Sequence, residues 1–174
     1  LCTKFLIVEL MGKHSNIIFC QPDGTIIDSI KHISLNVSSV REVLPGRSYF
    51  IPNTMLKMNP LTISADEFIE KTLSKPLPVG KALYTSLTGI SPVIAEEICF
   101  RASIDSGMST SGLSDAEKLH LFGVFSRLME DVKNHCFTPL IIYRGKEPIE
   151  FSALTLTCYG DCKSHAFDSI STVL

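Results

Sequence analysis

The spacing of hydrophobic positions divides the chain into three stretches. Up to about residue 60 apolar residues form short runs, as in strands, and from 61 to 136 they recur every three or four positions, as in helices. From 137 to 174 short runs return. This order predicts an α+β fold: a β-rich domain in two sequence halves, 1–60 and 137–174, with a helical module between them. An inserted module and a single domain with helices at one end both fit the order.

The first half is predicted to begin with a strand and a hairpin. Residues 4–10 are apolar on both faces until Glu9, a pattern typical of a central strand. Two further apolar runs, 17–20 and 25–33, flank the turn sequence Gln21-Pro22-Asp23-Gly24. Proline fixes one dihedral angle and glycine tolerates positive φ, so a hairpin is expected there.

Four helices are predicted in the middle stretch. Capping boxes at 64–67 and 114–117 begin the first and the fourth, which is the longest. The second follows a proline and covers about 79–87, and the third begins at Ser91-Pro92, with serine as the cap and proline in the first turn.

The last stretch repeats the strand pattern. Residues 140–143 and 149–159 are predicted strands joined by the turn 144–148, and Ser169 is expected to open a helix. We expect the chain to be a fragment of a longer protein, because it begins at Leu1 and stops within that helix.

Composition and charge narrow the classes of protein. The net charge of -2 excludes a uniformly basic nucleic-acid binder, although a local basic face is compatible with it. No apolar run approaches the roughly 20 residues of a membrane span, and the first residues lack the pattern of a secretion signal. The expectation is a cytoplasmic protein without a membrane partner.

Six cysteines stand mostly in apolar stretches, as small hydrophobic residues do, so we expect them to be reduced. Cys158, Cys162 and His165 leave a zinc site as an alternative. No second ligand pair stands at zinc-finger spacing, and no metal site is predicted.

No catalytic pattern is present. The sequence has no glycine-rich phosphate loop, no nucleophile elbow and no metalloprotease helix, and the adjacent Glu96 and Glu97 point about 100° apart on a helix. We therefore expect a protein that is not an enzyme and needs no cofactor.

The turn between the second and third helices is the first binding candidate. Gly89 permits a close approach, and the helix start at Ser91 offers unpaired amides to a phosphate, as in a helix-hairpin-helix. The alternative is an ordinary helix end followed by an ordinary cap.

The polar loop after the first strand is the second candidate. Lys13 and His14 are suited to phosphate oxygens, and Ser15 and Asn16 to sugars or bases. Arg41 and Arg47 would add positive charge if the sheet brings them near. The alternative is a capped β-turn in which Asn16 bonds its own backbone and Lys13 is solvated.

Together these segments resemble the NFACT amino-terminal region of the family that includes fibronectin-binding protein A, bacterial RqcH and eukaryotic NEMF. The resemblance is carried by five segments in the same order: 9–18, 23–31, 41–47, 89–98 and 167–174. It covers essentially the whole chain.

The resemblance implies a role in ribosome-associated quality control. Such proteins bind large ribosomal subunits that carry a stalled peptidyl-tRNA, and they recruit tRNA to add a carboxy-terminal tail to the nascent chain. The implied fold is similar to formamidopyrimidine-DNA glycosylases, with a helix-hairpin-helix and without the glycosylase chemistry. The residues that match the motif associated with tRNA handling are Glu9, Leu10, Met11, Gly12, Lys13, His14, Ser15 and Asn16.

The sequence departs from the family pattern in two places. The Asp-Arg pair that works with this motif would lie upstream of Leu1, and Lys13 replaces an arginine found in many members. Lysine keeps the charge but loses the bidentate fork. Two other functions stay open: a cell-surface adhesin with fibronectin as partner, which requires export, and a vestigial or active glycosylase.

Overall fold

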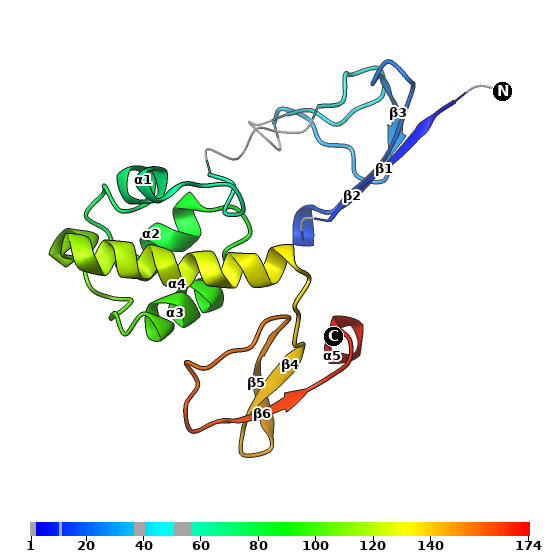
Figure 1. Ribbon diagram of the computed structural model, residues 1–174. Helices are drawn as coiled ribbons and strands as arrows, with labels where there is room; N and C mark the ends of the chain where they lie inside the picture. Colours follow the sequence, from blue (N-terminus) through cyan, green and yellow to red (C-terminus); the bar gives the residue numbers. More distant parts are fainter. Residues whose placement is uncertain (1–2, 11, 37–40, 51–56) are drawn as a thin grey trace. The chain divides into compact units, whose positions relative to one another are not determined.

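The computed structural model describes residues 3–10, 12–36, 41–50 and 57–174, and it has a mixed α and β fold (Figure 1). Contacts divide the chain into two compact units, Leu1–Thr54 and Met55–Leu174, and each unit is described by itself. The domain boundaries expected from the sequence, at 60 and 136, stay a prediction.

The first unit contains a three-stranded antiparallel sheet. Its strands are β1 (Phe5–Glu9), β2 (Asn16–Cys20) and β3 (Ile26–Ser29), in the order β1-β2-β3. The predicted hairpin is confirmed: the Gln21 amide donates to the Thr25 carbonyl over 2.8 Å, and Gly24 has a φ of +86°.

One face of this sheet is buried and the other is open. Ile18, Cys20 and Ile26 form a small core with Val43. On the opposite face, Leu6 is 68% exposed and Val8 is 55% exposed. The prediction of a central strand is wrong for the described residues, because β1 pairs only with β2 and lies at the edge. Apolar residues on both sides of β1 therefore do not mean burial on both sides here.

The second unit contains the helical module. Its α-helices are α1 (Ala65–Glu67), α2 (Val79–Ser86), α3 (Pro92–Arg101) and α4 (Asp115–Lys133), with a π-helical turn η2 (Phe68–Thr72) and a 3-10 turn η3 (Thr110–Gly112). Both predicted capping boxes are confirmed, because Ser64 and Ser114 each accept the amide of the glutamate three residues later.

Aromatic packing holds the helices together. The Phe68 ring lies 4.9 Å from the Phe125 ring and 5.4 Å from the Phe122 ring, so η2 is packed against α4. Leu83 of α2 and Ile98 of α3 are fully buried in the same core. Figure 1 shows α4 running along the module beside the other helices. Among the described residues, no helix is long and apolar enough to cross a membrane.

A second antiparallel sheet follows α4. It consists of β4 (Leu140–Arg144), β5 (Glu147–Ser152) and β6 (Lys163–Ala166), in the order β5-β4-β6, and the short helix α5 (Ile170–Val173) comes after it. Leu140 and Ile142 are buried with Leu156, and Val93 and Ile94 of α3 pack against them. The hairpin and the serine cap of the last helix are confirmed, and β6, whose residues are all exposed, was not predicted.

The predicted strand 149–159 is shorter in the structure, and its last predicted residues bind a buried acid instead. The side chain of Glu97 on α3 accepts the Thr157 amide over 2.6 Å and the Cys158 amide over 2.8 Å. It also accepts the Thr157 hydroxyl over 2.7 Å and Arg101 Nε over 2.6 Å, and the residue is fully buried. Amides that donate to Glu97 are not available to a strand ladder, so residues 157 and 158 do not extend β5, which ends at Ser152.

Replacing this acid should destabilise the second unit. Glu97→Gln removes the negative charge that meets Arg101 and two backbone amides in a buried site, so we expect a loss of about 3 kcal/mol in the free energy of unfolding. Urea unfolding followed by circular dichroism measures it. The matched control is Glu96→Gln, an exposed neighbour on the same helix, which should change stability by less than about 0.5 kcal/mol. Equal effects of the two changes would contradict the role of Glu97.

The same acid should make stability depend on pH. Burial raises the pKa of Glu97, but hydrogen bonds from Thr157, Arg101 and the Cys158 amide outweigh burial and hold the pKa below its usual value. The unfolded chain therefore takes up the proton first as pH falls. The contribution of Glu97 is complete above the ordinary glutamate pKa of about 4.3 and is lost as pH falls through the lowered value. In urea unfolding at stepwise lower pH, Glu97→Gln should show a smaller decline than the unmodified protein.

Candidate nucleic-acid interface

The loop from residue 10 to residue 15 joins β1 to β2 in the first unit. Glu9 and Asn16 lie directly opposite each other in the ladder, and they mark the base of the loop. Within it, residues Gly12–His14 form a 3-10 turn, η1, and the Ser15 amide donates to the Gly12 carbonyl over 3.0 Å. Gly12 has a φ of +55°, which a residue with a side chain rarely adopts, so glycine suits this position.

Glu9 is held by an arginine and a tyrosine from the segment 41–50. Arg41 Nη2 donates to the Glu9 carboxylate over 2.5 Å. The Tyr49 hydroxyl donates to the same carboxylate over 3.1 Å. The side chains of Glu9 and Arg41 are 9% and 8% exposed. Arg41 also donates to the Phe50 carbonyl over 2.9 Å and lies 5.6 Å from the centre of the Tyr49 ring. Burial, and then the hydrogen bond to Glu9, raise the pKa of Tyr49.

Asn16 fixes the other side of the loop base. Its side-chain oxygen accepts the Lys31 amide over 2.9 Å and the Ile17 amide over 3.0 Å, and its nitrogen donates to the Lys31 carbonyl over 2.9 Å. With its side-chain polar atoms engaged and 3% of its surface exposed, Asn16 connects the loop to the end of β3.

The tip of the loop is basic and exposed. Lys13 and His14 lie in η1 with no buried residue among them, and Lys31 Nζ donates to the Lys13 carbonyl over 3.0 Å. Within the described residues, none of these three side chains forms an ion pair. We call Lys13, His14 and Lys31 the basic tip. Free cations on an ordered backbone are suited to phosphate oxygens.

The structure gives two of the expected contact residues a supporting role. Asn16 and Arg41 are buried with their polar groups already bonded, so they do not present those groups to a ligand. Arg47 is exposed and pairs with Glu42 over 3.0 Å. Lys31 was not predicted, because it reaches the loop through contacts with residues distant in the sequence, namely Asn16 and Lys13.

The remaining residues of the motif are near the tip. Leu10 is 86% exposed, and Ser15 is partly buried beside the 3-10 turn. Met11 lies outside the described residues. Contact between the residues of this motif and nucleic acid stays a prediction.

The turn between α2 and α3 lies in the second unit. Gly89 has a φ of +76°, and the Ser91 hydroxyl caps α3 by accepting the Ile94 amide over 3.2 Å. The Thr88 amide donates to the Met58 carbonyl over 2.9 Å, whereas in the described part of the chain the amides of Gly89 and Ile90 have no acceptor. The turn therefore has the serine cap and the positive-φ glycine that the sequence predicted.

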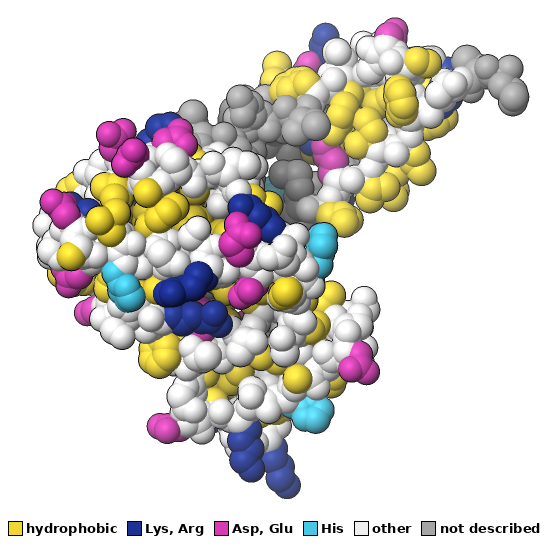
Figure 2. All heavy atoms as spheres, in the orientation of Figure 1, with side chains coloured by type: hydrophobic (Ala, Val, Ile, Leu, Met, Phe, Trp, Pro, Cys, Tyr) yellow, Lys and Arg dark blue, Asp and Glu magenta, His cyan; other side chains and the backbone are white. Residues whose placement is uncertain are grey.

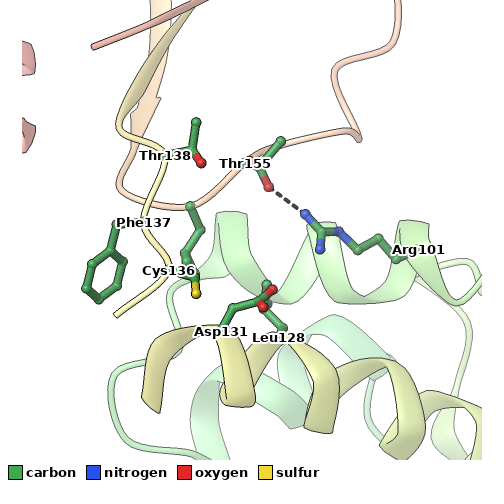
Figure 3. A pocket seen from close by; sticks show the side chains of 8 residues that line it. Arg101, Leu128, Asp131, Cys136, Phe137, Thr138 and Thr155 are labelled. Carbon is green, nitrogen blue, oxygen red and sulfur yellow. Dashed lines mark hydrogen bonds between the residues drawn. The ribbon is translucent and has the colours of Figure 1, made fainter. Parts of the chain in front are cut away.

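A pocket of about 240 Å³ lies between the helices and the segments that flank the β4–β5 hairpin (Figure 3). Figure 3 shows Arg101 and Asp131 on its helical side and Thr138 and Thr155 on the other. Arg101 already binds Glu97 and donates to the Thr155 carbonyl over 2.7 Å. The guanidinium of Arg101 therefore holds the segment after β5, and we assign no ligand to the pocket.

The described cysteines are free thiols, and those of Cys158 and Cys162 lie in the segment before β6. Burial, and then the neighbouring Glu97, raise the pKa of Cys158 to about 12, which disfavours the thiolate that a metal requires. In the ranges that the structure covers, no three His, Cys, Asp or Glu side chains are grouped to hold a metal ion.

Comparison with known proteins gives a consistent result. The family model described as NFACT N-terminal and middle domains matches residues 1–174. A Bacillus subtilis protein named Rqc2 homolog RqcH is 34% identical over 171 residues, which are 97% of this chain and 28% of the relative.

Two solved structures are also similar to this chain. The fibrinogen binding protein from Staphylococcus aureus has a TM-score of 0.73 and 26% identity, over 98% of this chain and 57% of the other. The N-terminal part of the fibronectin/fibrinogen-binding protein from Streptococcus suis has a TM-score of 0.61 and 26% identity, over 97% and 54%. The chain thus spans about half of the solved chains.

Substitutions at the base of the loop and at its exposed tip should change local stability by different amounts. Asn16→Ala leaves the Lys31 amide and carbonyl without their partner in a partly buried place, so we expect local stability to fall by about 1 kcal/mol. Lys13→Ala and His14→Ala, on the exposed tip, should change it by less than about 0.5 kcal/mol. Hydrogen exchange of the Ile17 and Lys31 amides measures local opening. Equal protection in all three variants would show that Asn16 does not fix the loop.

Proposed function

Because the chain belongs to the family of NFACT N-terminal and middle domains, we propose that it is an RNA-binding part of a ribosome-associated quality control factor. In this proposal the whole protein binds stalled large ribosomal subunits and recruits tRNA for carboxy-terminal tailing of nascent chains. The name of the Bacillus subtilis relative, Rqc2 homolog RqcH, supports this assignment. The protein acts in the cytoplasm.

One observation carries the proposal: the basic tip stands on an ordered base. Glu9 and Asn16, opposite each other in the ladder, are both buried and bonded, so they hold the ends of the loop in place. The cations at the tip have no acid to neutralise them within the described residues. Fixed, unpaired cations favour a polyanion because little order has to be gained on binding.

The turn before α3 is a second contact in this proposal. The free amides of Gly89 and Ile90, next to the helix start at Ser91, fit a phosphate as in a helix-hairpin-helix. The proposal also gives the chain an architecture similar to that of formamidopyrimidine-DNA glycosylases. The role is binding rather than catalysis.

A second candidate function is adhesion to host matrix proteins. It is favoured by the names of the two solved relatives, which describe fibrinogen and fibronectin binding. Surface plasmon resonance on immobilised fibronectin tests it directly. Binding that is unchanged after the basic tip is removed would assign adhesion to another surface.

The tRNA-binding proposal predicts a defined loss. Changing Lys13, His14 and Lys31 together to alanine in the full-length protein should weaken tRNA binding. It should also lower the slope of log affinity against log salt by about 1 for each phosphate that the variant no longer neutralises. Filter binding over a salt series measures both, and affinity purification shows whether large ribosomal subunits still accompany the protein.

The control changes the same number of basic residues elsewhere. Lys71, Lys118 and Lys133 lie on helices and each pairs with a nearby acid. Their combined change to alanine should leave tRNA binding and the salt slope unchanged. A salt-insensitive interaction, or an equal loss in both triple variants, would contradict the proposed role of the tip.

A further inference from the structure

The second sheet has a face that the helical module does not cover. Side chains alternate along β4, so Leu140 and Ile142 point toward the core while Ile141 and Tyr143 point away. In the ladder Ile141 lies opposite Phe151 of β5 and His165 of β6. We call this the open face.

Aromatic rings line the open face. Phe151 is 52% exposed, and His165 is exposed. The centres of the Phe167 and His165 rings lie 4.8 Å apart, and the planes of the rings meet at 72°. This edge-to-face pair holds His165 in place. Tyr143 is partly exposed further along the same side of β4. The face therefore presents rings on all three strands.

Positive charge borders these rings. Lys163 lies opposite Tyr143, and Arg144 and Lys146 are exposed at the hairpin end. In the described part of the chain none of the three forms an ion pair. Figure 2 shows Lys and Arg side chains projecting beyond the β4–β5 hairpin, whose place is seen in Figure 1.

The acids near the sheet do not cancel this charge. Glu150 lies opposite Ile142, on the core side, and the Tyr159 hydroxyl lies 3.5 Å from it. Glu147, in the hairpin, is opposite Arg144, and these two described residues do not form an ion pair with each other. The helix α5 packs near β4 at the end away from the hairpin and leaves the basic end accessible (Figure 1).

We propose that the open face binds single-stranded RNA, with bases stacked on Phe151 and His165 and phosphates near Lys163 and the hairpin cations. Exposed rings on adjacent strands beside unpaired cations are what such RNA requires, because bases stack on π faces and the backbone needs positive charge. The open sheet face of the first unit differs, since its exposed Phe19 ring lies beside the aliphatic side chains of Leu6 and Val8. The inference rests on the proposed RNA-binding function and adds a second RNA surface to it.

The test measures binding of a short fluorescein-labelled oligouridine to the full-length protein by fluorescence anisotropy. Phe151→Ala should weaken binding about tenfold, because stacking contributes about 1–3 kcal/mol per base. Phe151→Leu keeps an apolar side chain but removes the π face, so it should also weaken binding. Lys163→Gln should lower the salt slope by about 1.

The matched control is Phe100→Ala, which removes a ring that is 51% exposed on α3 and is not among the residues that pack against the core of the second sheet. It should bind as the unmodified protein does. Crosslinking with 4-thiouridine RNA should label peptides 147–152 and 163–167. Unchanged affinity of Phe151→Ala, an equal loss in Phe100→Ala, or labelling only outside these peptides would overturn the inference.

The two RNA proposals fail in different ways. If the basic-tip variant loses tRNA while Phe151→Ala binds the oligomer normally, the open-face inference is wrong and the proposed function stands. If Phe151→Ala loses ribosomal subunits but not the oligomer, the face contacts the subunit without binding single-stranded RNA, and the inference is again wrong. If the unmodified protein binds neither tRNA nor the oligomer, the proposed function itself fails.

Discussion

The ion pair between Glu9 and Arg41 is the interaction on which the first unit depends. Both side chains are buried, so either one without the other would be a desolvated charge costing several kcal/mol. The pair joins the end of β1 to a segment more than thirty residues away, with Tyr49 completing it. The shape of the loop after β1 is therefore decided by residues that are distant in the sequence. The motif from Glu9 to Asn16 is continuous in the sequence, but its two end residues are buried and bonded, whereas Lys13 and His14 between them are exposed.

Much of the fold was predictable from local chemistry. The turn at Gly24, the serine caps and the helix ranges depend on neighbours within a few residues, and the structure has them where the sequence indicates. The predictions that were wrong depend on contacts between residues distant in the sequence. Thr157, at the end of the predicted strand, instead donates its amide to Glu97, sixty positions away, and β6 forms from mostly polar residues that carry no apolar alternation. Among the described residues β1 has a strand on one side only, and this could not be read from its own composition, because an apolar face shows only that something is suited to cover it.

The candidate site shows the same division. Lys13 and His14 were found because polar residues between two apolar strands are unusual, and the structure leaves them exposed. Arg41 was expected to face a ligand because positive charge alone was considered, whereas its partner Glu9 takes it into the interior. Lys31 was missed because its position depends on a distant residue: its amide donates to the side chain of Asn16, fifteen residues earlier. Charge can be read from a sequence, but the choice between an internal partner and an external one requires the fold.

The open side of the first sheet has a practical consequence. Leu6, Val8, Ile17 and Phe19 are at least 37% exposed, and β1 beside them has an unpaired edge among the described residues. An exposed apolar surface next to free backbone donors and acceptors is a template for pairing with another chain. Residues 1–54 prepared alone are thus expected to aggregate, and detergent or a fused solubility partner would be needed to keep them in solution. Biochemical work on the basic tip should therefore begin from the longest form of the protein that can be obtained.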